Sequence, residues 1–249
     1  MELLIIGGGG HLGRLVGPAL AESHRVTVAD RMPDLRLDWA TTTVVDVLDQ
    51  DALAHAAEDM DAIVYMAMGT KEDWGSPEWA RSQFDVNVTG LYNALQAAAR
   101  ADVRRVVIAG SLSVFDAFLS STDDATPDAV DAYGLSKRLG EDVARAAATE
   151  LGLHITILRL VLPMADDVWL ASADDKHAAV MTSGSDTAAA FGAAVLRDEP
   201  GCTAMAITGD HERRHLDWSR AEALLDWRPL SRRPFVTAAS PAAFSAAED

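Results

Sequence analysis

The sequence predicts an α/β protein built around a doubly wound parallel sheet, and two observations support this prediction. Short apolar, β-branched runs alternate with Ala-rich segments of helical period over the first 160 residues. The apolar runs are nearly continuous, which is typical of strands that are buried on both faces. Helices between such strands cover the two faces, so the alternation indicates a parallel sheet between two helical layers.

Each expected strand in this part of the chain is a short run rich in Val, Ile and Leu. The six runs lie at residues 2–7, 25–30, 42–47, 61–68, 104–111 and 154–160. The spacing of apolar residues predicts helices between most of them, at residues 11–23, 50–60, 76–101 and 131–152. Beyond Leu162 the alternation loosens. We expect residues 164–184 to be irregular, followed by a helix at 185–199, a strand at 202–209 and a helix at 216–227.

The composition limits the classes of partner. The chain has 249 residues, of which 49% are hydrophobic and 24% charged, as in an ordinary globular protein. Its formal net charge of −17 argues against nucleic acid and against an anionic membrane surface, because both need clustered Lys and Arg. A single cysteine, Cys202, excludes an intramolecular disulfide and suits a reducing compartment. The opening apolar run is too short for a signal peptide or a membrane span, so we expect a cytoplasmic protein.

Four consecutive glycines join the first strand to the first helix, and they fit two nucleotide-binding spacings. Gly8, Gly10 and Gly13 satisfy G-x-G-x-x-G, whereas Gly7, Gly10 and Gly13 satisfy the wider G-x-x-G-x-x-G. Glycines at such a turn let the backbone approach a pyrophosphate, whose charge is stabilised by the helix N-terminus. The run therefore predicts a dinucleotide site and leaves the spacing open.

The ends of the next two strands bear on which dinucleotide binds. Asp30 ends the second strand, where its carboxylate can accept hydrogen bonds from the adenosine ribose and would repel a 2′-phosphate. NAD is therefore favoured. Arg31 follows directly and could partner a 2′-phosphate, so NADP is the alternative. Asp46, at the end of the third strand, could meet the adenine amino group or be a solvated carboxylate.

A Tyr–Lys pair and two serines carry the chemistry. Tyr133 and Lys137 are four residues apart on an expected helix, so they project from one face. A phenol has a pKa near ~10, and a nearby ammonium group favours its ionised form. Ser111 and Ser113 follow the fifth strand at the carboxyl edge of the sheet, where ligands bind in doubly wound folds. A serine hydroxyl there can hydrogen-bond the substrate oxygen that Tyr133 deprotonates.

Taken together, these residues resemble those of the extended short-chain dehydrogenase/reductases, the superfamily that includes NAD-dependent epimerases and dehydratases. The resemblance covers residues 1–230 and implies a Rossmann fold. It assigns the glycine motif to the wider spacing, and the catalytic set to Ser111, Tyr133 and Lys137. It also places the family's helix asparagine at Asn87 and its strand-six arginine at Arg159. Further cofactor contacts are expected at His11, Leu12, Val47, Met66 and Ala67, and no metal is expected.

Size and layout are most similar to the uronate dehydrogenase-like members, although these carry Ser-Asn-His where this chain has Ser111, Leu112 and Ser113. The resemblance thus implies an NAD-dependent oxidoreductase that oxidises a hydroxyl of a small sugar or sugar acid. Candidate substrate contacts, besides the two serines, are Thr70 and Trp169. An ordinary loop threonine and a packing tryptophan are the alternatives for these two positions.

Two other functions are compatible with the same residues. A sugar or sugar-nucleotide epimerase would return the hydride to its substrate, and a non-catalytic NAD(P)-sensing protein would only bind the cofactor. The Ala-rich helices at 78–100 and 131–151 suggest a homodimer, because the family commonly pairs through them; the alternative is that these faces simply cover the sheet. We divide the chain into an NAD-binding domain at 1–160, a small substrate-binding lobe at 161–231 that interleaves with the core, and a tail at 232–249 that we expect to be partly disordered.

Overall fold

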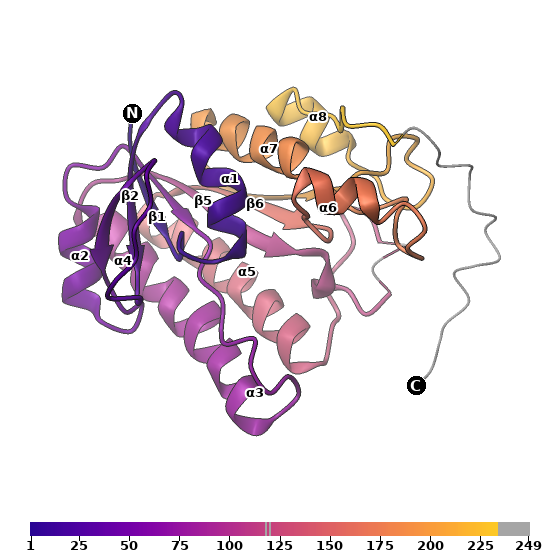
Figure 1. Ribbon diagram of the computed structural model, residues 1–249. Coiled ribbons are helices and arrows are strands. Elements are labelled where there is room, and N and C mark those ends of the chain that lie inside the picture. The colour runs from indigo at the N-terminus through magenta and orange to yellow at the C-terminus, as the bar shows by residue number, and fades with distance from the viewer. Residues whose placement is uncertain (118, 120, 234–249) are drawn as a thin grey trace.

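A computed structural model describes residues 1–117, 119 and 121–233 (Figure 1). Its centre is one parallel sheet of seven strands in the order β3-β2-β1-β4-β5-β6-β7. The strands are β1 (Glu2–Ile6), β2 (Arg25–Asp30), β3 (Thr41–Val44), β4 (Ala62–Tyr65), β5 (Arg105–Ser111), β6 (His154–Leu160) and β7 (Gly201–Ile207). The predicted fold class is therefore confirmed.

Two helical layers cover the sheet (Figure 1). On one face lie α1 (His11–Ala21), α7 (Gly184–Leu196) and α8 (Ser219–Leu225); on the other lie α2 (Gln50–Ala57), α4 (Leu91–Arg100) and α5 (Ala132–Leu151). The remaining helical segments are short: α3 (Pro77–Phe84), η1 (Asp85–Gly90), η2 (Leu112–Val114) and α6 (Asp166–Ala171).

Alternate residues of each central strand supply the two halves of the core. In β1, Leu3 and Ile5 pack on the side of α1 and α7, where Phe191 is fully buried. Leu4 and Ile6 pack on the opposite side, against α2 and α4. Each of these fully buried side chains contributes roughly 1.5–3 kcal/mol relative to an exposed position. Near-continuous apolar runs form the central strands because both of their faces are covered.

Besides shorter ends, such as those of β4 and α8, the structure departs from the expected elements in three places. The predicted helix at 76–101 is interrupted by η1, a π-helical turn that widens the backbone between α3 and α4. The third strand ends at Val44 and not at Val47, because Asp46 begins a turn in which its carboxylate accepts the N–H of Leu48. The stretch at 164–184, expected to be irregular, includes α6.

The outer edge of β7 is covered by side chains. Arg220 Nη1 donates to the Ala204 carbonyl at 3.0 Å, and the Ala206 N–H donates to Asp123 Oδ1 at 2.9 Å. Because β7 joins the same sheet as β1, residues 161–231 contribute both a strand and α7 to the main core. The division of the chain at residue 160 stays a prediction. Of the predicted tail, only Arg232 and Arg233 lie within the described residues.

In the part of the chain that the structure describes, no helix combines the length and the apolar character needed to cross a membrane.

Candidate active site

The glycine run forms a tight turn between β1 and α1, and its glycines have different roles. Gly7 has a φ of +82°, and a Cβ there would lie 2.5 Å from the Ala67 backbone. A Cβ at Gly13 would lie 2.2 Å from the Gly8 carbonyl oxygen. At Gly10 a Cβ would meet only the Gly7 carbonyl oxygen, at 3.4 Å. These roles match the wider spacing: two glycines allow close backbone packing, and the central one caps α1 without a side chain over the helix N-terminus.

The expected adenosine-binding residues surround this turn. Asp30 Oδ2 accepts the N–H of Gly9 at 2.9 Å, which fixes the carboxylate beside the turn. Arg31 and Asp46 are exposed at the ends of β2 and β3. Because a carboxylate has several acceptor sites, Asp30 retains lone pairs for ribose hydroxyls. The glycine turn and this carboxylate fit an adenine dinucleotide.

The other expected cofactor contacts lie at the same sheet edge. Met66 and Ala67 follow β4, where Met66 donates its N–H to Ile6 in β1. Val47 is buried, and its carbonyl accepts a hydrogen bond from Asn93. His11 and Leu12 begin α1. The exposed His11 ring lies within hydrogen-bonding distance of the Pro163 carbonyl, 3.2 Å from Nε2, which joins the glycine turn to the segment after β6.

Ser111 and Tyr133 meet at the carboxyl end of β5. Asp131 caps α5 by accepting the N–H groups of Tyr133 and Gly134, and this cap orients the first turn of the helix. The Ser111 hydroxyl lies near enough to the phenol of Tyr133 to favour its ionised form and so to lower its pKa. Ser111 Oγ accepts the N–H of Ser113 at 3.1 Å. Burial raises the pKa of Tyr133 above 10.0, the Ser111 hydroxyl lowers it, and the nearby Asp131 carboxylate raises it.

Lys137 lies one helical turn after Tyr133. Its Nζ donates to the Ala109 carbonyl at 3.1 Å and lies 6.0 Å from the centre of the Tyr133 ring. Burial lowers the pKa of Lys137 to about 8. An ammonium group so placed favours the phenolate form of Tyr133, so the pair supplies a base and the positive charge that supports it.

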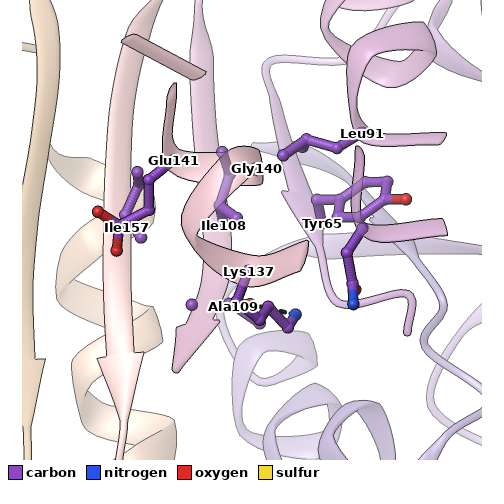
Figure 2. Close-up of a pocket in the computed structure, with 10 residues that line it drawn as sticks. Tyr65, Leu91, Ile108, Ala109, Lys137, Gly140, Glu141 and Ile157 are labelled. Atoms are coloured by element: carbon purple, nitrogen blue, oxygen red, sulfur yellow. Dashed lines mark hydrogen bonds between the residues drawn. The ribbon is translucent and has the colours of Figure 1, made fainter. Parts of the chain in front are cut away.

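Asn87 occupies the π-helical turn η1, facing α5. Its Nδ2 donates to Ser136 Oγ at 3.0 Å, and Ser136 Oγ donates to the Tyr133 carbonyl at 2.8 Å. Asn87 Oδ1 is buried without a partner among the described residues. A cavity of about 10 Å³, roughly the size for one water molecule, is lined by both Asn87 and Lys137. Figure 2 shows Lys137 at this cavity, with Tyr65 and Leu91 among the other lining residues. The π-helical turn thus brings Asn87 to the helix that carries the Tyr–Lys pair.

The segment between β4 and α3 contains Thr70, an expected substrate contact, and Trp74, which the sequence did not single out. Thr70 is held in place by Ser82 Oγ, which accepts its N–H at 3.0 Å, and by Gln83, which donates to its carbonyl at 3.0 Å. Trp74, four residues later, has its ring centre 5.8 Å from that of Tyr133. No periodic pattern in this loop indicated that Trp74 would reach Tyr133.

Trp169 is not placed to stack on a substrate beside Ser111 and Tyr133. Its side chain is only 4% exposed, and the indole N–H donates to the Met181 carbonyl at 2.9 Å. The Arg233 guanidinium lies 4.1 Å from the centre of the ring. These contacts correspond to the packing alternative, because an interior ring with its N–H already bonded has little surface left for a ligand.

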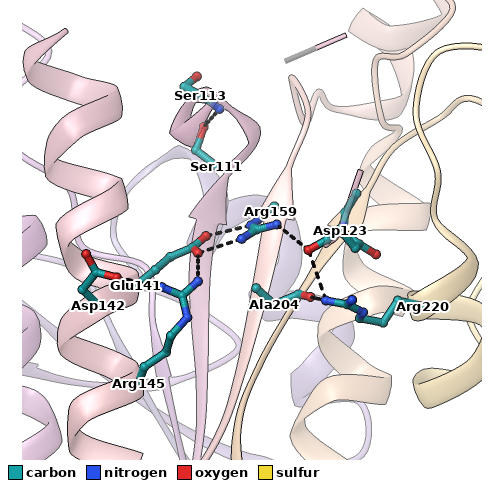
Figure 3. Close-up of polar contacts among 10 residues, drawn as sticks. Ser111, Ser113, Asp123, Glu141, Asp142, Arg145, Arg159, Ala204 and Arg220 are labelled. Atoms are coloured by element: carbon teal, nitrogen blue, oxygen red, sulfur yellow. Dashed lines mark hydrogen bonds and ion pairs between the residues drawn. The ribbon is translucent and has the colours of Figure 1, made fainter. Parts of the chain in front are cut away.

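A buried ion pair lies beneath the site, and it also escaped sequence reasoning. Arg159 in β6 donates to both Glu141 carboxylate oxygens, each at 2.8 Å, and both side chains are 2% exposed (Figure 3). The Phe115 ring covers the guanidinium at 4.9 Å. Arg159 lies beside Gly110 in the strand pairing, one residue before Ser111. The pair therefore fixes α5 to β6 next to the serine. Arg159 was expected only as a family position, and nothing in the sequence indicated Glu141 as its partner.

The arrangement can transfer a proton to or from a hydroxyl group placed at the carboxyl edge of the sheet. Ser111 can orient the oxygen, Tyr133 can exchange its proton and Lys137 supplies the nearby charge. Within the described ranges, no group of three or more His, Cys, Asp or Glu side chains is arranged to hold a metal ion.

Comparison with known proteins agrees with this geometry. Residues 3–182 match the model of the NAD dependent epimerase/dehydratase family. An L-arabinose 1-dehydrogenase (NAD(P)(+)) of Haloferax volcanii is 31% identical over 189 residues, which cover 70% of this chain and 69% of that protein. A uronate dehydrogenase of Pseudomonas syringae is 30% identical over 165 residues, covering 64% of this chain and 58% of that protein.

Among solved structures, a glucuronic acid dehydrogenase from Chromohalobacter salexigens superimposes with a TM-score of 0.79 at 20% identity. The superposition covers 94% of this chain and 85% of that one. At this identity the likeness concerns the fold.

Proposed function

The chain belongs to the NAD-dependent epimerase/dehydratase family, and from that premise we propose that it is an oxidoreductase that oxidises a hydroxyl group of a small sugar or sugar acid. The observation that carries the proposal is the contact of Tyr133 with Ser111, with Lys137 one helical turn away. The similarity to an L-arabinose 1-dehydrogenase and a uronate dehydrogenase supports this class of substrate.

Three side chains share the proposed proton transfer. Ser111 donates a hydrogen bond to the substrate oxygen and so directs the hydroxyl group towards Tyr133. The Tyr133 phenolate removes the hydroxyl proton as the carbon–hydrogen bond breaks. Lys137 stabilises the phenolate, and this support is needed because burial alone raises the pKa of Tyr133. When bound, NAD supplies the acceptor for the hydride and a positive ring near the phenol.

The residues proposed to hold NAD are the glycine turn, with Asp30 for the adenosine ribose. NAD is preferred to NADP because the Asp30 carboxylate, fixed beside the glycine turn by the N–H of Gly9, would repel a 2′-phosphate. Lys137 and Asn87 lie at the opposite end of the site, where the nicotinamide ribose would bind.

A sugar epimerase is the second candidate, and the name of the matching family favours it. The same three side chains would then serve a hydride that returns to the substrate. A non-catalytic NAD(P)-sensing role ranks lower, since it gives no reason for the contact between Tyr133 and Ser111.

We also propose that the protein forms a homodimer through α4 and α5. The exposed Tyr92 of α4 supports this arrangement. Most alanines of the two helices are buried against the sheet, so the exposed faces of α4 and α5 would form the contact (the buried alanines are Ala94, Ala97, Ala98, Ala144, Ala147 and Ala148). The lone Cys202 supports a reducing compartment such as the cytoplasm. Light scattering at micromolar concentration tests the dimer, and a monomeric mass would refute it.

An absorbance assay for reduced nicotinamide tests the proposed activity. The purified protein is mixed with NAD or NADP and a panel of free aldoses, uronic acids and simple alcohols. We expect reduction of NAD that Tyr133→Phe abolishes. If every free sugar is silent and NAD co-purifies with the protein, the epimerase is supported instead. If neither cofactor binds, both enzymatic proposals are wrong.

A further inference from the structure

Trp74 is a large aromatic side chain left exposed beside the catalytic tyrosine. It is 64% exposed, and its ring centre lies 5.8 Å from that of Tyr133. Single exposed apolar side chains are ordinary on protein surfaces, so exposure alone carries little weight. The position of Trp74 is stronger evidence than its exposure, because a substrate whose hydroxyl group reaches Tyr133 has to lie next to the indole ring.

The indole is supported from beneath and presented by a defined loop. The ring of the buried Trp79, 5% exposed, lies 4.4 Å from it between ring centres. Asp73 and Gly75 on either side both have positive φ, at 48° and 87°. The start of the same loop is tied to α3 through the contacts of Thr70 with Ser82 and Gln83. Trp74 thus has a backing that holds it beside Tyr133 and a surface that faces outward.

Acidic residues lie next to this ring, both in its own loop and at the start of α5. Asp131, the cap of α5, is two residues from Tyr133, and Glu72 and Asp73 directly precede Trp74. Lys71 is the one cation in the loop at 66–76. Such surroundings disfavour a substrate with its own carboxylate, since like charges at close range repel.

We infer that Trp74 is a stacking platform for the ring of a neutral aldose, so that the preferred substrate is an uncharged sugar and not a sugar acid. The apolar face of a sugar ring, formed by its C–H groups, covers the exposed indole while a ring hydroxyl reaches Ser111 and Tyr133. The acidic rim selects against the anionic analogue. This inference rests on the proposed dehydrogenase activity and narrows its substrate class.

Matched sugars and matched variants test the platform. The substrates are D-glucose with D-glucuronate and D-galactose with D-galacturonate, pairs that differ only in a CH2OH or carboxylate group at C5. The proteins are the wild type, Trp74→Ala, Trp74→Phe and the control Leu196→Ala. Leu196 is 61% exposed at the end of α7, just before β7 begins, so its truncation also removes an exposed apolar side chain. It lies near the amino ends of the strands, whereas Tyr133 lies at their carboxyl ends.

We expect the wild type to have a higher kcat/KM for the aldose of the preferred pair. In Trp74→Ala, the KM for that aldose rises about 3- to 10-fold, the effect of losing one aromatic contact. The KM for NAD stays unchanged, and Trp74→Phe recovers most of the loss. A structural role would instead alter both KM values and the melting temperature.

Two results would overturn the inference while leaving the dehydrogenase intact. One is a preference of the active wild type for the uronic acid, and the other is an unchanged aldose KM in Trp74→Ala. Failure of the wild type to oxidise any sugar would refute the proposed function itself, and the platform with it. A binding experiment separates failure of the platform from failure of the proposed activity. In Tyr133→Phe loaded with NAD, we expect the addition of an aldose to change the tryptophan fluorescence. In the double variant with Trp74→Phe, we expect that change to be absent.

Discussion

Replacing Glu141 by Leu should destabilise the protein strongly, because it leaves the buried Arg159 guanidinium without its hydrogen-bonded carboxylate. Both side chains are 2% exposed and are joined by two hydrogen bonds of 2.8 Å. What Arg159 retains is the Asp123 carbonyl at 3.4 Å, the Phe115 ring at 4.9 Å and a longer-range attraction to the Asp123 carboxylate, none of which replaces the lost ion pair. Removing one partner of a buried ion pair costs about 3–5 kcal/mol. For a domain of this size that corresponds to a fall in Tm of roughly 6–20 °C.

The free energy of unfolding from urea titration, with thermal melts by circular dichroism, measures the effect. Two further variants make the test specific. Arg145→Ala should cost at most about 1 kcal/mol, because this second partner of Glu141 is 42% exposed and is hydrated when unpaired. The double variant Glu141→Leu with Arg159→Leu should be more stable than Glu141→Leu alone, since no buried charge remains. The reasoning is wrong if Glu141→Leu costs less than about 1 kcal/mol. It is also wrong if the cost of the double variant equals the sum of the costs of Glu141→Leu and of Arg159→Leu measured alone.

Four other predictions concern the cofactor, the base and pH. Gly13→Ala places a Cβ 2.2 Å from the Gly8 carbonyl oxygen and should weaken NAD binding, measured by calorimetry, at least about tenfold. Gly192→Ala is the control, because nothing is found within 4 Å of a Cβ there, and it should leave NAD binding unchanged. Asp30→Ser removes the acceptor for the ribose and the repulsion of a 2′-phosphate, so the KM for NAD should rise about tenfold while that for NADP falls; equal changes for both cofactors would contradict this assignment. Lys137→Met should lower kcat by about 100-fold or more and shift the pH–rate profile to higher pH, and a profile that stays in place would separate Lys137 from the ionisation of Tyr133. Burial raises the pKa of Asp123 to about 6, so the folded protein binds the proton of this carboxyl group more tightly than the unfolded chain does. The stability that the protonated group contributes is therefore present at low pH and is lost as the pH rises from about 4 through about 6. Asp123→Asn should remove this loss in urea titrations at about pH 4, 5 and 6.

The sheet and the common helix face of Tyr133 and Lys137 could be predicted from the sequence because both depend on local patterns. The strands at 25–30 and 154–160 have the bounds expected from their apolar runs. Trp218 and Trp227, which flank α8 at its two ends, are buried and in edge-to-face contact at 6.2 Å between ring centres. Tyr133 and Lys137 share a helix face at a spacing of four residues, and this regularity needs no knowledge of the fold.

The features that were missed depend on contacts between distant segments. The π-helical turn forms where Asn87 bonds Ser136 and where Gly140 lets α5 approach, and these partners lie about fifty residues further along the chain. The contact of Trp74 with Tyr133 joins a loop to a helix start, with no period to reveal it. For Trp169 the sequence allowed stacking or packing equally, and only the position of the Met181 carbonyl separates the two.

The covered edge of β7 has a consequence for self-association. An exposed edge strand presents free N–H and C=O groups to which a strand of another molecule can add. Here Arg220 occupies the carbonyl of Ala204, and the Asp123 carboxylate occupies the N–H of Ala206. The same residues that anchor the loop between Ser113 and Tyr133 therefore block strand addition on this side. Substituting Asp123 would expose a hydrogen-bonding template as well as loosening the active-site loop, so loss of activity and a tendency to aggregate would arise from one change.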